Sequence, residues 1–182
     1  MKCEDCKLSG IQIIELDRYK DSRGSFYETY KEEEYIKLGM KTKFIQDNYS
    51  RSARNVLRGL HFTLKKPQIQ LITLIQGEII DVIVDIRKSS ETFGKWASVK
   101  LSNDGPCQIY IPFGFAHGFY VISKFADISY KVSEYYDPND DFGIKWNDPT
   151  LNISWPSTEP TLSVKDNSNK SFSFYLERNL LT

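Results

Sequence analysis

The sequence contains two histidines, His61 and His117, and both stand near glycine and aromatic residues. Histidine is the side chain best suited to proton transfer near neutral pH. His61 lies in the segment 57–62 and His117 in the segment 112–119, at the edges of expected strands. Acid–base chemistry and a purely structural role are equally compatible with these positions, so other residues must decide between them.

Metal ligation is the other common use of histidine, and the spacing argues against it. Metal-binding cupin proteins place two histidines one residue apart, with a glutamate a few residues later. Here no second histidine lies within two residues of His61 or His117. Cys3 and Cys6 form a CxxC pair, but a structural zinc site needs four ligands and no second pair follows. We therefore expect no metal site.

Four other residues suggest partners for such chemistry. Tyr130 could donate a proton to a carbanion from the face opposite a base, although most of the 11 tyrosines are expected in the core or on the surface. Asp166 could orient a histidine and raise its basicity, although the sequence alone favours an exposed loop position. Arg23 and Arg58 could bind phosphate oxygens through bidentate charge-assisted bonds.

Length and composition limit the class of protein. The chain has 182 residues, 24 basic and 24 acidic side chains and 14% aromatic residues. Zero net charge argues against a dedicated nucleic-acid-binding protein, which usually has a basic excess. No apolar run approaches the roughly 20 residues of a membrane helix, and the N-terminus lacks the apolar stretch of a signal peptide. We expect one cytoplasmic domain over residues 1–182, with residues 1–7 as a loose N-terminal arm.

Short strands separated by turn residues dominate the chain. A helix is expected over residues 32–38, and a turn over residues 21–24. Two apolar runs, 69–75 and 78–86, are expected to form a hairpin around Gly77. The other expected strands are 11–16, 44–47, 96–101, 108–111, 118–122 and 127–133. No alternation of strands and helices is present, so the pattern favours an all-β jelly roll, whose inner faces can enclose a small ligand.

Ten segments, taken together, resemble the dTDP-4-dehydrorhamnose 3,5-epimerase family. The resemblance extends over roughly residues 8–167, in order, and as a set it is more specific to the family than to the substrate. The matching segments are 21–28, 44–50, 55–62, 77–88, 92–94, 111–119, 130–136, 146–149, 155–156 and 162–166. The resemblance implies a cupin-type jelly roll (a double-stranded β-helix) with a few short flanking helices, which forms a homodimer and uses no metal or cofactor.

The resemblance also implies roles for individual residues. His61 is expected to remove the proton beside the 4-keto group of a nucleoside-diphosphate 4-keto-6-deoxy sugar, with Asp166 as its dyad partner. Tyr130 is expected to return a proton from the other face. In such dimers the partner subunit supplies part of the nucleotide site. The positions implied to bind substrate are Arg23, Phe26, Glu28, Gln46, Asn48, Arg58, Gln70, His117 and Tyr136.

Gln70 departs from the family pattern. The family normally has a lysine here, near the keto oxygen, whereas an amide donates a hydrogen bond without bringing positive charge. Lys65 or Lys66 is an alternative source of that charge. The departure keeps open an enzyme that inverts only C3 or only C5, on a sugar such as a CDP-linked one. A 3,4-ketoisomerase and a non-catalytic sugar-nucleotide-binding cupin are further alternatives. The resemblance implies a product used for surface polysaccharide, such as lipopolysaccharide O-antigen, or for secondary metabolites.

Overall fold

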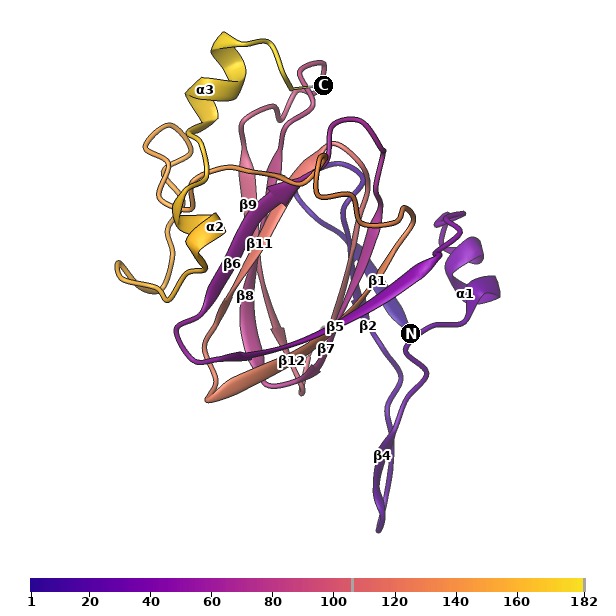
Figure 1. Cartoon of the computed structure of the whole chain (residues 1–182). Coiled ribbons are helices and arrows are strands. Elements are labelled where there is room, and N and C mark those ends of the chain that lie inside the picture. The colour runs from indigo at the N-terminus through magenta and orange to yellow at the C-terminus, as the bar shows by residue number, and fades with distance from the viewer. Residues whose placement is uncertain (106, 182) are drawn as a thin grey trace.

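Two antiparallel sheets face each other in the computed structural model, which describes residues 1–105 and 107–181 (Figure 1). The six-stranded sheet has the order β1 (Lys2–Asp5), β2 (Gln12–Glu15), β10 (Gln108–Ile111), β7 (Gln70–Gln76), β12 (Phe125–Val132) and β5 (Gln46–Ala53). The five-stranded sheet has the order β13 (Phe142–Gly143), β6 (Leu57–Phe62), β11 (Phe115–Val121), β8 (Glu78–Asp85) and β9 (Trp96–Ser102). The expected all-β architecture of the cupin type is confirmed.

Only short elements flank these sheets. The helices are α1 (Glu32–Lys37), α2 (Val164–Asn167) and α3 (Phe172–Glu177), and α1 confirms the helix expected at 32–38. A two-stranded hairpin, β3 (Tyr19–Asp21) and β4 (Gly24–Phe26), projects away from the sheets (Figure 1). Within the described residues, no helix has the length and apolar character needed to cross a membrane.

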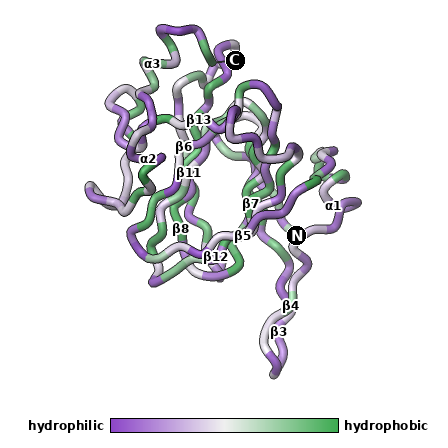
Figure 2. The backbone as a smooth tube through the Cα atoms, in the orientation of Figure 1, coloured by the Kyte–Doolittle hydropathy of each residue, from purple (hydrophilic) through white to green (hydrophobic). Residues whose placement is uncertain are grey.

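Strand β8 shows how the apolar pattern builds the fold. Alternate side chains of a strand point to opposite faces of its sheet. Ile79 and Ile83 belong to the core between the two sheets, whereas Val82 and Val84 pack in a second core with Phe172. Because both faces of β8 are covered, its sequence is apolar almost throughout, and the tube in Figure 2 is green along much of it. The β3–β4 hairpin is mostly purple to white in the same view, in keeping with its exposure.

The hairpin expected around Gly77 is wrong. Strand β7 lies in the six-stranded sheet and β8 in the five-stranded sheet, so the chain crosses between sheets at Gly77. Gly77 has φ of +100°, and a Cβ there would lie 2.4 Å from the carbonyl oxygen of Phe125. A glycine between two apolar runs therefore indicates a reversal of the chain, but it does not identify the strand with which each run pairs.

The N-terminal arm expected over residues 1–7 is not loose. Residues Lys2–Asp5 form β1 and pair with β2 along its whole length, from Lys2 opposite Glu15 to Asp5 opposite Gln12. This pairing extends the six-stranded sheet at one edge. Cys3 and Cys6 are free thiols, both partly buried. Strand β1 cannot be recognised from the sequence MKCED, because an exposed edge strand rich in charged residues shows little alternation of apolar and polar side chains.

Candidate active site

A cavity lies between the sheets and receives side chains from both of them. Its lining residues come from β5, β6, β7, β11 and β12, and are Ser50, Arg58, His61, Gln70, Ile72, His117, Gly118, Phe119, Ile128 and Tyr130. An adjoining hollow shares His61, Gln70 and His117 and adds the segment 134–137 and Asp141. Five of the residues singled out from the sequence therefore line one cavity, and Tyr136 lines its extension.

His61 forms a dyad with Asp166. His61 lies on β6, and its Nε2 is 2.5 Å from Oδ1 of Asp166, which is buried on α2. The start of α2 is fixed by Ser163, whose Oγ accepts a hydrogen bond from the backbone N–H of Asp166 at 3.0 Å. The exposed loop position that the sequence alone favours for Asp166 is thus wrong. The contact leaves Nδ1 of His61 without a protein partner among the described residues.

The charge state of Asp166 follows from two opposing effects. Burial disfavours the carboxylate, but the hydrogen bond and charge of His61, together with Ser163 and Lys165, outweigh burial. The pKa of Asp166 is therefore held below its ordinary value. An ionised Asp166 orients the His61 ring and stabilises the imidazolium that forms when Nδ1 takes a proton.

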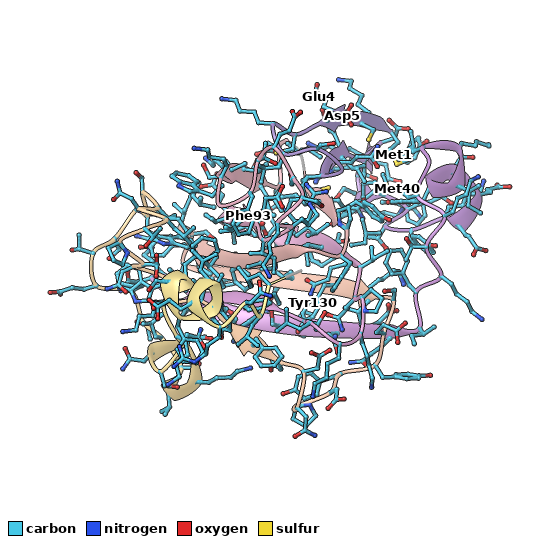
Figure 3. All side chains as sticks on the ribbon, turned by 90° about the horizontal axis from the view of Figure 1, so that it is seen from above. Met1, Glu4, Asp5, Met40, Phe93 and Tyr130 are labelled. Atoms are coloured by element: carbon cyan, nitrogen blue, oxygen red, sulfur yellow. The ribbon has the colours of Figure 1, made fainter. Side chains whose placement is uncertain are left out.

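Tyr130 enters the cavity from the opposite sheet. It lies on β12, with Asn48 of β5 and Ile72 of β7 as its strand neighbours. In Figure 3, Tyr130 lies among the strands, away from Met1 and Met40. Burial raises the pKa of its phenol, and the nearby charge of Arg58 only partly offsets that effect. Tyr130 therefore stays protonated across the neutral range and can donate a proton.

Two glycines let β6 and β11 approach closely beside the histidines. A Cβ on Gly118 would lie 2.6 Å from the carbonyl oxygen of Arg58, and one on Gly59 would lie 2.5 Å from Cα of Gly118. His61 and His117 are direct partners in this strand pair, and the register shifts between His117 and Phe119. The glycines beside each histidine in the sequence thus bring the two imidazoles to neighbouring positions.

Polar contacts hold the other substrate candidates at the rim. Arg58 is exposed, and its Nε donates a hydrogen bond to Oγ of Ser52 at 2.9 Å. Nε2 of Gln46 donates to Oδ1 of Asn48 at 2.9 Å, and Oε1 of Gln46 accepts from the backbone N–H of Tyr136 at 3.2 Å. Gln46, Asn48 and Tyr136 are thus linked to one another; Tyr136 lines the extension of the cavity, whereas Gln46 and Asn48 are not among the lining residues.

Gln70 lies in the cavity wall, as expected, but its amide is partly engaged. Its Nε2 donates to Oε1 of Gln68 at 3.0 Å. The lysines considered as substitutes are held by other groups. Nζ of Lys66 pairs with Asp137 at 3.2 Å, and Nζ of Lys65 donates to the carbonyl oxygen of Asn139 at 3.5 Å. The region around Gln70 is therefore less positive than a lysine would make it.

Three more of the expected substrate residues, besides Gln46 and Asn48, are not among the residues that line the cavity. Arg23 and Phe26 belong to the projecting β3–β4 hairpin, where Phe26 is 66% exposed. Arg23 pairs with Asp21 of the same hairpin. Glu28 is exposed in the connection to α1. The structure does not bring these three residues to the cavity of their own chain.

Three supporting acidic or basic residues were missed from the sequence. Oδ2 of Asp81 lies at hydrogen-bonding distance from Nε2 of His117, 2.8 Å away. Asp141 pairs with Lys165 of α2 and accepts a hydrogen bond from the Tyr136 hydroxyl at 3.0 Å, which raises the pKa of Tyr136. The sequence did indicate a special role for Asp81, because this aspartate interrupts an apolar strand. Asp141 and Lys165 lie in polar segments, where charged residues are common, so nothing in the sequence indicated their roles.

The arrangement as a whole favours proton transfer. Among the described residues, each of the two histidines has one nitrogen hydrogen-bonded to a carboxyl group and the other without a protein partner. In the described part of the chain, no three His, Cys, Asp or Glu side chains are grouped so that they could hold a metal ion. His61 on one sheet and Tyr130 on the other line the same cavity, and the side chain of Gln70 lies in its wall.

Comparison with known proteins identifies the family. A family model described as dTDP-4-dehydrorhamnose 3,5-epimerase matches residues 5–173. The chain is 48% identical over 149 residues to the enzyme of that name from Methanothermobacter thermautotrophicus, covering 82% of this chain and 80% of that protein. It is 34% identical over 168 residues to the dTDP-4-dehydrorhamnose 3-epimerase of Streptomyces niveus, covering 91% and 81%.

Comparison with solved structures identifies the same family of epimerases. The dTDP-6-deoxy-D-glucose-3,5-epimerase of Legionella pneumophila, in complex with dTDP-4-keto-L-rhamnose, matches with a TM-score of 0.93 and 43% identity. The match covers 99% of this chain and 96% of the other. The chain belongs to the dTDP-4-dehydrorhamnose 3,5-epimerase family.

Proposed function

We propose that this protein inverts C3 and C5 of a dTDP-linked 4-keto-6-deoxyhexose, the substrate class of its family. The observation that carries the proposal is the placement of His61 and Tyr130. The base comes from the five-stranded sheet and the acid from the six-stranded sheet, and both line one cavity. Epimerisation needs this arrangement, because a proton must leave one face of a carbon and return to the other.

The chemistry follows from the keto group. A proton on a carbon beside a ketone is acidic, because the resulting carbanion delocalises onto oxygen as an enolate. Nδ1 of His61 takes the proton, and Asp166 stabilises the imidazolium through Nε2. Tyr130 then gives a proton to the opposite face. Donors such as Gln70 lie in the same wall and can stabilise the enolate oxygen.

The test is deuterium exchange in D₂O, followed by NMR of the sugar nucleotide. We expect deuterium at C3 and C5 of a dTDP-linked 4-keto-6-deoxyglucose, with inversion at both carbons. His61→Asn should abolish exchange while binding of the nucleotide persists. A product with its ketone at another carbon would indicate a ketoisomerase, and binding without exchange would indicate a non-catalytic module; either result would overturn the proposal.

Gln70 favours a second candidate function, inversion at a single carbon. Two successive enolates form in a double epimerisation, and each needs stabilisation at the same oxygen. A neutral amide supplies roughly half the strength of a charge-assisted bond. One relative, from Streptomyces niveus, is named as a 3-epimerase. Exchange confined to C3 or to C5, or a preference for a CDP-linked substrate in a panel of nucleotides, would support this alternative.

We also propose a homodimer in which each cavity is completed by the hairpin of the partner subunit. Support comes from the β3–β4 hairpin, which carries Arg23 and Phe26 away from their own cavity (Figure 1). Arginine and an exposed aromatic ring suit a nucleoside diphosphate, through phosphate contacts and base stacking. Neither side chain contributes to a core of its own chain.

Subunit mixing tests this arrangement. Arg23→Ala and His61→Asn proteins should each have little activity alone. After mixing and subunit exchange, each heterodimer has one cavity with both native residues, so about a quarter of wild-type activity should return. Sedimentation should show a dimer. A monomer, or no recovery after proven exchange, would contradict the proposal.

The place of the reaction in the cell is part of the same proposal. A nucleotide-activated deoxysugar is a donor for glycosyl transfer, so a later transferase step must consume the product. We propose that the protein acts in the cytoplasm and supplies deoxysugar for a surface polysaccharide such as an O-antigen. Loss of the deoxysugar from surface polysaccharide after deletion of the gene would support this; an unchanged sugar composition would contradict it.

A further inference from the structure

A second histidine–aspartate pair lies in the wall of the cavity. Nε2 of His117 is 2.8 Å from Oδ2 of Asp81, and Asp81 is completely buried. Oδ1 of Asp81 has no hydrogen-bond partner among the described residues. Asp81 lies on β8 between Ile79 and Ile83, so it points toward the core that the two sheets enclose. Within the residues that the structure describes, His117 is therefore the one group that compensates this buried carboxyl.

The two dyads differ in the surroundings of their carboxyl groups. Asp166 lies on α2, where Lys165 and Ser163, in addition to His61, favour its carboxylate. In the described part of the chain, His117 is the one basic group that acts on Asp81. Burial raises the pKa of Asp81, and the contact with His117 opposes this rise. The two histidines thus bind the same kind of partner in very different electrostatic environments.

The buried position restricts how many protons the Asp81–His117 pair can hold. A carboxylate beside a neutral imidazole would leave an uncompensated negative charge in the core, which is costly. Two arrangements avoid that charge. In one, a carboxylate pairs with an imidazolium; in the other, a carboxylic acid donates to Nε2 of a neutral ring. Both arrangements carry a hydrogen on Nδ1 of His117.

Other charged groups near His117 do not change the conclusion that Nδ1 of His117 carries a hydrogen. Arg58 and His61 approach from β6, and Tyr130 from β12. Glu134, Asp137 and Asp141 line the adjoining hollow. Acidic groups stabilise a positive ring, whereas a nearby arginine stabilises the arrangement in which the shared proton lies on Asp81. In both arrangements Nδ1 of His117 carries a hydrogen.

We propose that Asp81 is a positioning residue that keeps a hydrogen on Nδ1 of His117, so that His117 is a donor into the cavity. The same contact by Asp166 leaves Nδ1 of His61 as an acceptor, and so the two dyads have opposite roles. The use of this donor rests on the proposed function. In the epimerase reaction, the Nδ1–H group of His117 stabilises the enolate oxygen, and this contribution is important because the neutral side chain of Gln70 supplies no positive charge there.

Nitrogen NMR of histidine-labelled protein tests the proposal without substrate. The chain has only two histidines, so His61→Asn leaves His117 as the single imidazole, and His117→Asn leaves His61 as the matched control. At pH 7.5 we expect Nδ1 of His117 to show a directly bonded proton. Nδ1 of His61 should show none. An unprotonated Nδ1 on His117 would overturn the proposal, whether or not the protein is an epimerase.

Asp81→Val provides the second test, because valine suits a buried strand position and adds no charge. Without Asp81, no carboxyl fixes the hydrogen on Nδ1 of His117, so the share of rings that carry it there should fall well below the wild-type share. The variant should then lose roughly 10- to 100-fold in kcat. An unchanged kcat, or full retention of the Nδ1 proton in the variant, would contradict the role of Asp81. If the wild type has no epimerase activity, the proposed function fails while the NMR result stands separately.

Discussion

Replacing Asp166 with asparagine should disable the base while leaving the fold intact. The buried carboxyl lies 2.5 Å from Nε2 of His61, and an amide of the same shape has two ways to meet that nitrogen. If the amide donates to Nε2, Nδ1 carries the hydrogen and cannot accept the sugar proton. If the amide accepts from Nε2–H, the imidazolium loses its counter-charge. Either orientation should lower kcat by about 10³- to 10⁴-fold, or roughly 4–5.5 kcal/mol in the barrier.

The assay compares initial rates of deuterium incorporation from D₂O for the wild type and Asp166→Asn. Asn167→Ala is a matched control, because Asn167 is the exposed next residue on α2 and should leave the rate unchanged. Thermal unfolding of each protein separates a chemical defect from loss of fold. A folded Asp166→Asn protein that exchanges deuterium within tenfold of the wild-type rate would refute the dyad.

Three further predictions follow from the same geometry. Tyr130→Phe should slow inversion about 10²-fold or more while exchange by His61 slows less, which NMR of product and substrate can compare. Because burial raises the pKa of Tyr130 above its ordinary value of about 10, its ionisation should reduce kcat/KM only above that pH; an alkaline limb near pH 8 that vanishes in Tyr130→Phe would disagree. Gly118→Ala should lower the free energy of unfolding by about 2 kcal/mol in urea titrations, because its Cβ would lie 2.6 Å from a backbone oxygen; unchanged stability would count against the close approach.

The strands were largely predictable from the sequence, but their pairing was not. The runs 69–75, 78–86, 96–101 and 127–133 correspond to β7, β8, β9 and β12 within two residues. The error at Gly77 arose because neighbours in sequence were assumed to be neighbours in a sheet. Strand β5 begins two residues later than expected and continues to Ala53, because its alternating polar residues face the cavity on one side and solvent on the other.

The candidate site was partly predictable for a physical reason. Histidines are scarce in this sequence, and the two segments that contain them form paired strands beside the cavity. Asp166 lies 105 residues beyond His61, and local sequence gives no indication of its burial. An aspartate within an apolar strand, such as Asp81, is expected to have a hydrogen-bond partner, but the sequence does not show which residue that partner is. Arg23 and Phe26 lie away from the cavity of their own chain because the β3–β4 hairpin projects from the sheets (Figure 1). The spacing of residues in the sequence gives no information on the direction of this hairpin.

The most direct test of the account is the position of deuterium in a dTDP-linked 4-keto-6-deoxyglucose after incubation with this protein in D₂O. With His61 as base and Tyr130 as opposing acid, we predict deuterium at both C3 and C5 and inversion at each carbon. Deuterium at neither carbon, with folded protein and bound nucleotide, would contradict the assignment of the cavity as an epimerase active site.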